Sequence, residues 1–147
     1  MNSEASVYED AKIIETLRGN GYRVTPQRLT VAKAVLNGRG HTSAEELYNR
    51  VKRLSPTISL ATVYESLEAL ERSGLVTSFI VEPGKKVYDA DTRPHINLVC
   101  RICGEITDVA MEPKDLQAVS TLSQVSEFSD VKISVTGHGV CPKHRKR

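Results

Sequence analysis

Four potential metal ligands near the C-terminal end constrain the fold of this chain more than any other feature. The first two, Cys100 and Cys103, are spaced C-x-x-C, and the other two repeat this spacing in C-P-K-H: Cys141 and His144. Three thiolates and one imidazole make up a tetrahedral zinc set, and a full set leaves no open position for a substrate. The spacing therefore predicts a structural Zn²⁺ site that holds the end of the chain against the turn between the first two cysteines.

An alternative for Cys100 and Cys103 is a redox-active pair, with Cys141 incidental. The three cysteines are an odd number, which argues against a disulfide framework. The first ten residues are acidic and polar, unlike a signal peptide, and no apolar run approaches the roughly 18 residues of a membrane span. We therefore expect a cytoplasmic protein with no membrane partner, in a compartment where cysteines more often bind metal or react than form disulfides.

Basic residues are concentrated in the N-terminal half. The 147-residue chain has a net charge of +2, but the segment from Arg18 to Arg53 carries eight basic residues and only two acidic ones. Such a segment, joined to a slightly acidic remainder, is typical of a module that binds a polyanion and has a second module attached. The alternative is a solvated face of scattered lysines and arginines.

The periodicity of the N-terminal half predicts short helices followed by one hairpin. Apolar residues recur at three- and four-residue steps behind capping residues, which predicts helices within 7–21, 24–38, 41–54 and 59–74. Two β-rich runs around Glu82-Pro83-Gly84 then predict a hairpin. This order of elements is that of a winged helix-turn-helix domain, which we expect over residues 1–88.

The third predicted helix carries the strongest start signal. Two overlapping capping boxes precede its apolar positions, Thr42 with Glu45 and Ser43 with Glu46. The same periodicity, followed to its end, predicts that Leu54 is buried with the rest of the apolar face.

The fourth predicted helix carries candidate DNA contacts. Ser59 caps it, and Ala61, Thr62 and Tyr64 lie off its apolar seam in the first two turns. Small, hydroxylated and aromatic side chains suit a major groove, where they meet thymine methyls, base edges and phosphates. Two lysines just past the hairpin tip are expected to touch the phosphate backbone: Lys85 and Lys86. The alternative for Tyr64 is partial burial against a neighbouring helix.

The pattern changes after the hairpin. Residues 89–94 are polar and end at Pro94, as in a linker. The pattern of residues 95–147 predicts a strand, a second strand, a helix and a last strand over 130–135. A small unit of this kind has little core, and its exposed strand edges commonly pair with another copy. We therefore expect an α+β fold, a winged-helix domain followed by a small α/β dimerisation domain, and a homodimer.

A second set of ligands combines imidazoles with carboxylates: His41, Asp89, His95 and Asp108. Such mixed ligands favour Fe²⁺, Mn²⁺ or Zn²⁺ over soft, thiolate-preferring metals. Because His41 belongs to the first domain and the other three to the linker and second domain, a shared metal would fix the angle between the domains. The alternative is that each histidine is a surface or capping residue.

Four stretches of the chain resemble the ferric uptake regulator family, which includes iron, zinc, manganese and peroxide sensors. These stretches are GYRVTPQRLTVAKAVL, HTSAEELY, SLATVYESLEALERSGLV and CRICGEITDV, and the resemblance runs from about Leu17 to His144. It implies a cytoplasmic, homodimeric transcription regulator with an N-terminal winged helix and a C-terminal dimerisation domain. A regulatory metal between the domains would set the dimer in its DNA-binding shape.

The resemblance also implies roles for single residues. Tyr64 matches a base-contacting tyrosine, Arg23 a basic residue near the minor groove, and Arg28 a contact to the DNA backbone. The three cysteines match structural zinc ligands, and four positions match the regulatory ligands: His41, Asp89, His95 and Asp108. An aspartate at position 89 is similar to the peroxide-sensing branch, in which iron-bound histidines become oxidised.

The chain departs from the family pattern at positions that bear on the metals and on the operator. His144 stands where the family has a fourth cysteine, a replacement that zinc accepts. Asn97 stands where a second histidine usually follows His95, so that only an amide oxygen is offered to a regulatory metal. Glu65 follows Tyr64 where some members carry a basic DNA-contacting residue, which predicts a different operator.

These patterns together predict a metal-dependent DNA-binding repressor of metal homeostasis or peroxide stress genes that binds palindromic operators. An enzyme with a small-molecule substrate is disfavoured, because the H-x-E and P-C-x-x-C pair of zinc deaminases and the Gly-rich phosphate loops are absent from the sequence. The remaining alternative is a winged-helix zinc protein that acts mainly through protein–protein interaction.

Overall fold

The computed structural model describes residues 9–38, 40–125, 127–129 and 131–145. The chain divides into two compact units, residues 1–92 and 93–147, which are considered one at a time. Within the described part of the chain, every helix is too short or too polar to cross a membrane.

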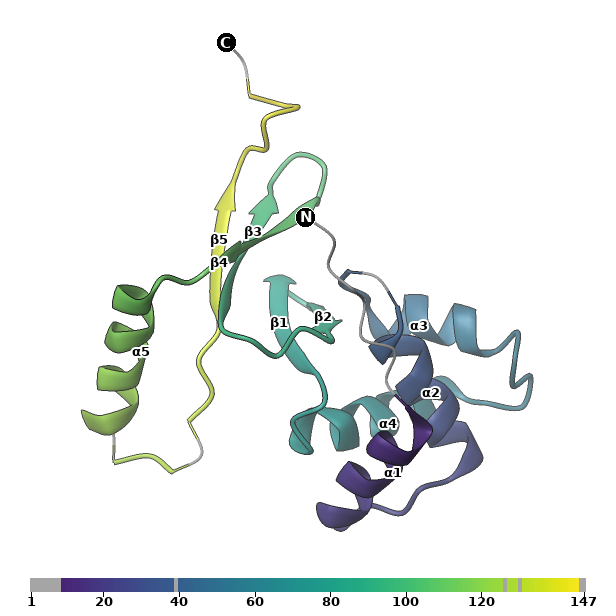
Figure 1. Cartoon of the computed structure of the whole chain (residues 1–147). Helices are drawn as coiled ribbons and strands as arrows, with labels where there is room; N and C mark the ends of the chain where they lie inside the picture. Colours follow the sequence, from purple (N-terminus) through teal and green to yellow (C-terminus); the bar gives the residue numbers. More distant parts are fainter. Residues whose placement is uncertain (1–8, 39, 126, 130, 146–147) are drawn as a thin grey trace. The chain divides into compact units, whose positions relative to one another are not determined.

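The described residues of the first unit form four helices and a two-stranded hairpin (Figure 1). In chain order its elements are α1 (Asp10–Gly19), α2 (Pro26–Leu36), α3 (Ala44–Val51), α4 (Leu60–Arg72), β1 (Thr77–Glu82) and β2 (Lys85–Asp89). Three helices begin where a hydroxyl accepts a backbone N–H of the first turn, and these caps are Thr25, Ser43 and Ser59. Local sequence thus determines where α2, α3 and α4 start.

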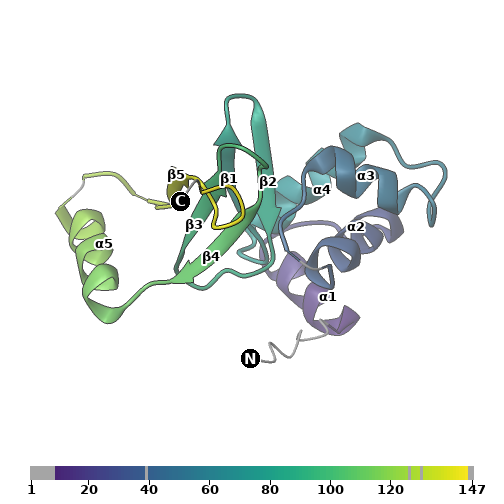
Figure 2. The ribbon, with the colours of Figure 1, turned by 90° about the horizontal axis from the view of Figure 1, so that it is seen from above.

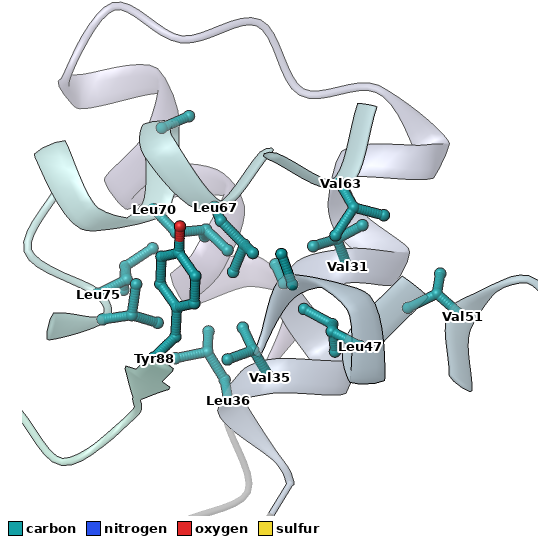
Figure 3. Close-up of a cluster of buried hydrophobic side chains, with 14 of the residues drawn as sticks. Val31, Val35, Leu36, Leu47, Val51, Val63, Leu67, Leu70, Leu75 and Tyr88 are labelled. Carbon is teal, nitrogen blue, oxygen red and sulfur yellow. The ribbon is translucent and has the colours of Figure 1, made fainter. Parts of the chain in front are cut away.

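The helices of the first unit share one apolar core, shown in Figure 3. Side chains from α2, α3 and α4 meet there with a leucine that follows α4 and a tyrosine of β2. The labelled members are Val31, Val35, Leu36, Leu47, Val51, Val63, Leu67, Leu70, Leu75 and Tyr88. Because Val63, Leu67 and Leu70 face this core, the side of α4 that carries Tyr64 is turned outward, and the Tyr64 side chain is 43% exposed.

Two details of the third helix differ from the sequence-based expectation. Only the Ser43–Glu46 capping box forms, and the Thr42 hydroxyl instead lies 3.4 Å from Glu46 Oε2. The prediction that Leu54 is buried was wrong, since its side chain is 77% exposed. The physical reason is that α3 ends at Val51, so the turn that follows carries Leu54 away from the apolar face.

The hairpin of the first unit is antiparallel and pairs Thr77 with Asp89. Its tight turn lies at Pro83 and Gly84, and the glycine has a φ of +78°, a conformation that costs other residues energy. This hairpin is the wing of the winged helix. Lys85 and Lys86 begin its second strand.

In the second unit, the part of the chain that the structure describes forms a mixed three-stranded sheet and one helix. Its elements are β3 (His95–Cys100), β4 (Ile106–Ala110), α5 (Pro113–Val125) and β5 (Val135–Gly139). The central strand β3 pairs antiparallel with β4 and parallel with β5. Within this unit, α5 stands away from the three strands in both Figures 1 and 2, and Leu122 on it is 61% exposed.

The position of the last strand differs from the sequence-based expectation. A strand over 130–135 was predicted, but β5 covers Val135–Gly139 and only Val135 is shared. The reason is pairing with β3, in which Gly137 lies opposite Leu98. A Cβ built on Gly137 would lie 2.8 Å from Leu98 Cδ2, so the absence of a side chain lets the two strands approach there.

Candidate metal centres and nucleic-acid interface

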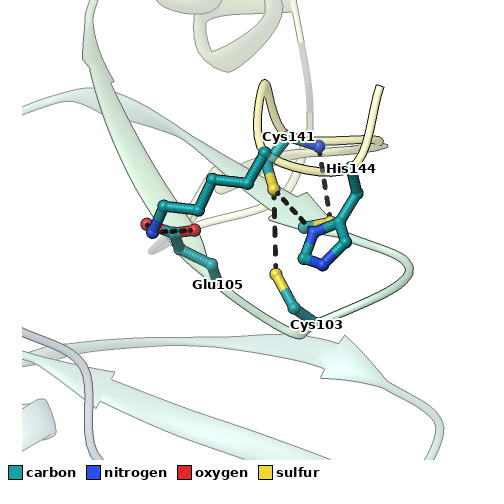
Figure 4. A network of polar contacts seen from close by, with 6 residues as sticks. Cys103, Glu105, Cys141 and His144 are labelled. Atoms are coloured by element: carbon teal, nitrogen blue, oxygen red, sulfur yellow. Dashed lines mark hydrogen bonds and ion pairs between the residues drawn. The ribbon is translucent and has the colours of Figure 1, made fainter. Parts of the chain in front are cut away.

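Cys100, Cys103, Cys141 and His144 come together in the second unit. One ligand atom from each of the four lies within 4.8 Å of the others. Cys103 Sγ is 3.8 Å from Cys141 Sγ, and Cys141 Sγ is 3.2 Å from His144 Nδ1, as Figure 4 shows. The end of β3, the turn after it and the segment after β5 supply these residues, so the parallel β3–β5 pair assembles the cluster.

The backbone around this cluster favours a thiolate. The N–H of Cys141 lies 3.4 Å from Cys100 Sγ and donates to it. This bond, followed by those from the N–H groups of Cys103 and Ile102, lowers the pKa of the Cys100 thiol to about 6. Lys143 Nζ lies 3.1 Å from both carboxylate oxygens of Glu105, which ties the C-terminal segment to the start of β4 (Figure 4). Three thiol sulfurs and one imidazole nitrogen at these separations fit a tetrahedral zinc ion.

The first unit contributes one half of the second candidate ligand set. His41 Nε2 lies 3.1 Å from Asp89 Oδ2. The His41 ring packs edge-on against Phe79 of β1, with ring centroids 5.3 Å apart. An imidazole nitrogen and a carboxylate oxygen at this separation can both face one cation.

The second unit contributes the other half. His95 Nε2 lies 3.2 Å from Asn97 Oδ1 and 3.9 Å from Asp108 Oδ1. The other ring nitrogen, Nδ1, is 2.7 Å from the carbonyl oxygen of Arg93, which can only accept, so Nδ1 carries the proton. With Nδ1 donating to that carbonyl, Nε2 is the ring nitrogen that could ligate a cation together with the oxygens of Asn97 and Asp108.

The predicted DNA-contacting residues of α4 divide into two groups. Ser59 Oγ accepts the N–H of Thr62 at 3.1 Å and lies 2.9 Å from Thr62 Oγ1, so both hydroxyls take part in the cap. Ala61 and Tyr64 are exposed. The Tyr64 hydroxyl donates to Glu45 Oε1 of α3 at 2.5 Å.

The predicted cationic contacts also have partners within the first unit. The Arg28 guanidinium donates to the carbonyl of Arg23 and lies 5.9 Å from the Tyr22 ring. Lys86 Nζ is 3.1 Å from Glu71 Oε2. Lys85 Nζ is 3.8 Å from Glu82 Oε1 at the wing tip.

Sequence reasoning missed the acidic partners on this surface, Glu45 and Glu71. Glu45 is 19 positions from Tyr64, and Glu71 is 15 positions from Lys86. Each contact joins two different elements, so no short-range pattern in the sequence indicates either pair.

The family model described as "Ferric uptake regulator family" matches residues 19–138. Among similar proteins, the peroxide operon regulator of Bacillus subtilis is 28% identical over 142 residues, covering 97% of each chain. The peroxide-responsive repressor PerR of Staphylococcus epidermidis is 30% identical over 139 residues, covering 94% of this chain and 91% of the relative.

Solved structures give the same result. The Vibrio cholerae ferric uptake regulator Fur is 29% identical with a TM-score of 0.65, covering 88% of this chain and 99% of that one. PerR from Streptococcus pyogenes is 28% identical with a TM-score of 0.51, covering 98% and 99%. These neighbours confirm the predicted architecture, a winged-helix domain followed by a dimerisation domain, and the predicted resemblance. The chain therefore belongs to the ferric uptake regulator family of metal-responsive, DNA-binding transcription regulators.

Proposed function

We propose that this protein is a cytoplasmic, homodimeric repressor that binds palindromic operators in a metal-dependent manner and controls peroxide-stress genes. One observation carries the proposal: each unit holds one half of an imidazole–carboxylate ligand set, His41 with Asp89 and His95 with Asp108. An ion shared by the two halves would couple the winged helix to the second unit. If binding of the ion depends on the metal concentration in the cell and not on peroxide, the protein would control metal homeostasis genes instead.

The Cys100, Cys103, Cys141 and His144 cluster would hold structural Zn²⁺. Its donor set is complete, so the ion would offer no open position to a substrate. The zinc would fasten the segment after β5 to the end of β3 and stabilise a small sheet with little core of its own. Such stabilisation is the general role of structural zinc in small domains.

His41, Asp89, His95 and Asp108 would hold the regulatory ion, with the amide oxygen of Asn97 beside them. Nitrogen and oxygen donors of this kind suit Fe²⁺ or Mn²⁺, and Zn²⁺ would also fit. Bound iron would supply the redox reactivity toward peroxide. Binding of the ion would shift the population toward the arrangement in which two winged helices match half-sites about one helical turn apart.

Two solved relatives have properties that the proposal gives to this chain. PerR from Streptococcus pyogenes senses peroxide and regulates genes. The Pseudomonas aeruginosa ferric uptake regulator, 25% identical with a TM-score of 0.70, was solved with manganese. For this chain, the exposed apolar residues of the second unit support a dimer, since Leu98 on β3 and Leu122 on α5 are 44% and 61% exposed.

Metal analysis tests both sites at once. Protein purified without added metal, then loaded with Mn²⁺ and desalted, is compared among wild type, His95→Ala and Cys100→Ser. We expect two metal ions per chain in the wild type, with manganese lost in His95→Ala and zinc lost in Cys100→Ser. A single metal that is indifferent to His95→Ala would refute the regulatory site.

A further inference from the structure

A hydrogen bond between two helices holds the tyrosine that is proposed to read DNA bases. The Tyr64 hydroxyl donates to Glu45 Oε1, and the two residues lie on α4 and α3. Tyr64 is in the second turn of α4 and Glu45 in the first turn of α3, and both side chains are exposed. The bond therefore lies on the protein surface, on the side of α4 that faces away from the apolar core.

Glu45 is not the acidic residue of the capping box of its own helix. The neighbouring Glu46 has that role, because its Oε2 accepts the N–H of Ser43 at 3.0 Å and completes the capping box. The bond to Tyr64 is the largest cause that lowers the pKa of Glu45, and the same bond raises the pKa of Tyr64. At neutral pH the pair is thus a carboxylate with a phenol, a charge-assisted hydrogen bond of the stronger kind.

We propose that Glu45 is a positioning residue that sets DNA sequence selectivity through Tyr64. This inference rests on the proposed function, in which Tyr64 enters the major groove. A tyrosine hydroxyl that becomes buried needs a hydrogen-bond partner, and Glu45 supplies one within the protein. The ring then reaches thymine methyls in an orientation fixed before binding, which lowers the cost of ordering it.

The charge of Glu45 has a separate effect that is common to all duplexes. A carboxylate beside the DNA repels phosphates and weakens the sequence-independent part of binding. This repulsion applies to operator and random duplexes alike, so it lowers both affinities by similar factors. The ratio of operator affinity to random-duplex affinity is therefore raised by the positioning of Tyr64 and not by the charge.

A double-mutant cycle tests this inference. An operator duplex is first selected by the metal-loaded wild type from a random pool, and affinities for it and for a random duplex are measured by fluorescence anisotropy at one salt concentration. We expect Glu45→Ala and Tyr64→Phe each to lower the affinity ratio about tenfold, the size expected for one charge-assisted hydrogen bond. The double variant should lose no more than either single variant, because both remove the same bond.

Two further variants separate positioning from charge. Glu46→Gln removes the same charge one residue away and keeps the capping box, so it should strengthen random-duplex binding and leave the ratio unchanged. Glu45→Gln keeps an acceptor for the hydroxyl and should restore most of the ratio. In the free protein, ultraviolet titration should show the Tyr64 pKa falling in Glu45→Ala, with Tyr64→Phe identifying its contribution.

The outcomes are distinct. An unchanged ratio in Glu45→Ala, or additive losses in the double variant, would overturn the role of Glu45 while DNA binding itself stands. Failure of the wild type to select any duplex from the pool would refute the proposed function and this inference with it.

Discussion

Thr42 and Tyr88 exchange two backbone hydrogen bonds, with the Thr42 N–H donating to the Tyr88 carbonyl at 3.1 Å and the Tyr88 N–H donating to the Thr42 carbonyl at 2.8 Å. This isolated bridge joins the residue before the α3 cap to the second strand of the wing. Because His41 precedes Thr42 and Asp89 follows Tyr88, the bridge is what places the imidazole beside the carboxylate. Half of the proposed regulatory site is therefore built into the frame of the winged helix.

Asp89→Asn should weaken the regulatory site and leave the zinc site intact. Loss of the carboxylate charge next to His41 removes a hard oxygen donor, so we expect Mn²⁺ affinity to fall about 10- to 100-fold or more, while zinc content stays unchanged. Isothermal titration calorimetry measures the Mn²⁺ affinity, and elemental analysis measures the zinc content. His138→Ala is the matched control, because His138 is exposed on β5 outside both ligand sets. Equal loss of manganese affinity in both variants would count against the site.

His144 is expected to be the fourth zinc ligand. His144→Ala should lose zinc or bind it much more weakly, whereas His144→Cys should retain it, because a fourth thiolate completes an equally favourable tetrahedral set. Zinc release to a chromophoric chelator measures this directly. Lys143→Ala, which removes the ion pair with Glu105 next to the site, is the control and should keep its zinc. Full zinc retention in His144→Ala would show that another group closes the site.

The core of the first unit predicts a clear contrast between two leucines. Leu67 has no exposed surface, and Leu67→Ala should lower the free energy of unfolding by about 2–5 kcal/mol because it leaves a cavity. Leu54 is 77% exposed, and Leu54→Ala should change the free energy of unfolding by no more than about 0.5 kcal/mol. Urea denaturation followed by circular dichroism compares them. Similar losses in both variants would contradict the observed end of α3.

Arg28 is expected to bind DNA phosphate; it lies in the first turn of α2, where its guanidinium donates to the Arg23 carbonyl. Arg28→Ala should weaken operator and random duplexes by similar factors and reduce the salt slope of binding by about one. Arg72→Ala is the control, because Arg72 pairs with Glu68 in the last turn of α4. Anisotropy titrations at several salt concentrations give the slope, and an unchanged slope in Arg28→Ala would remove this residue from the DNA interface.

Those parts of the fold that depend on neighbours in sequence could be predicted. Ser43 and Ser59 cap α3 and α4 as expected, because capping needs only a hydroxyl and an N–H three residues later. The last strand could not be predicted, because its position is set by pairing with β3, and Gly137 fits opposite Leu98 although glycine is a poor strand former.

In the candidate sites too, contacts between sequence neighbours could be predicted and contacts between distant elements could not. The spacing of Cys100 and Cys103 is visible in the sequence because both ligands sit on one turn. The bond from Tyr64 to Glu45 gave no signal, since it depends on how α3 and α4 pack over a shared core. Likewise, periodicity continued past the point where α3 ends, which is why Leu54 was misplaced.

Metal-dependent DNA binding is tested most directly by the affinity of the zinc-loaded protein for its selected duplex, measured with and without Mn²⁺. We expect Mn²⁺ to tighten binding by about 5- to 150-fold, the usual range of allosteric coupling, in the wild type but not in His95→Ala. Equal affinity of the wild type with and without the ion, at Mn²⁺ concentrations that saturate the site, would contradict the proposed mechanism.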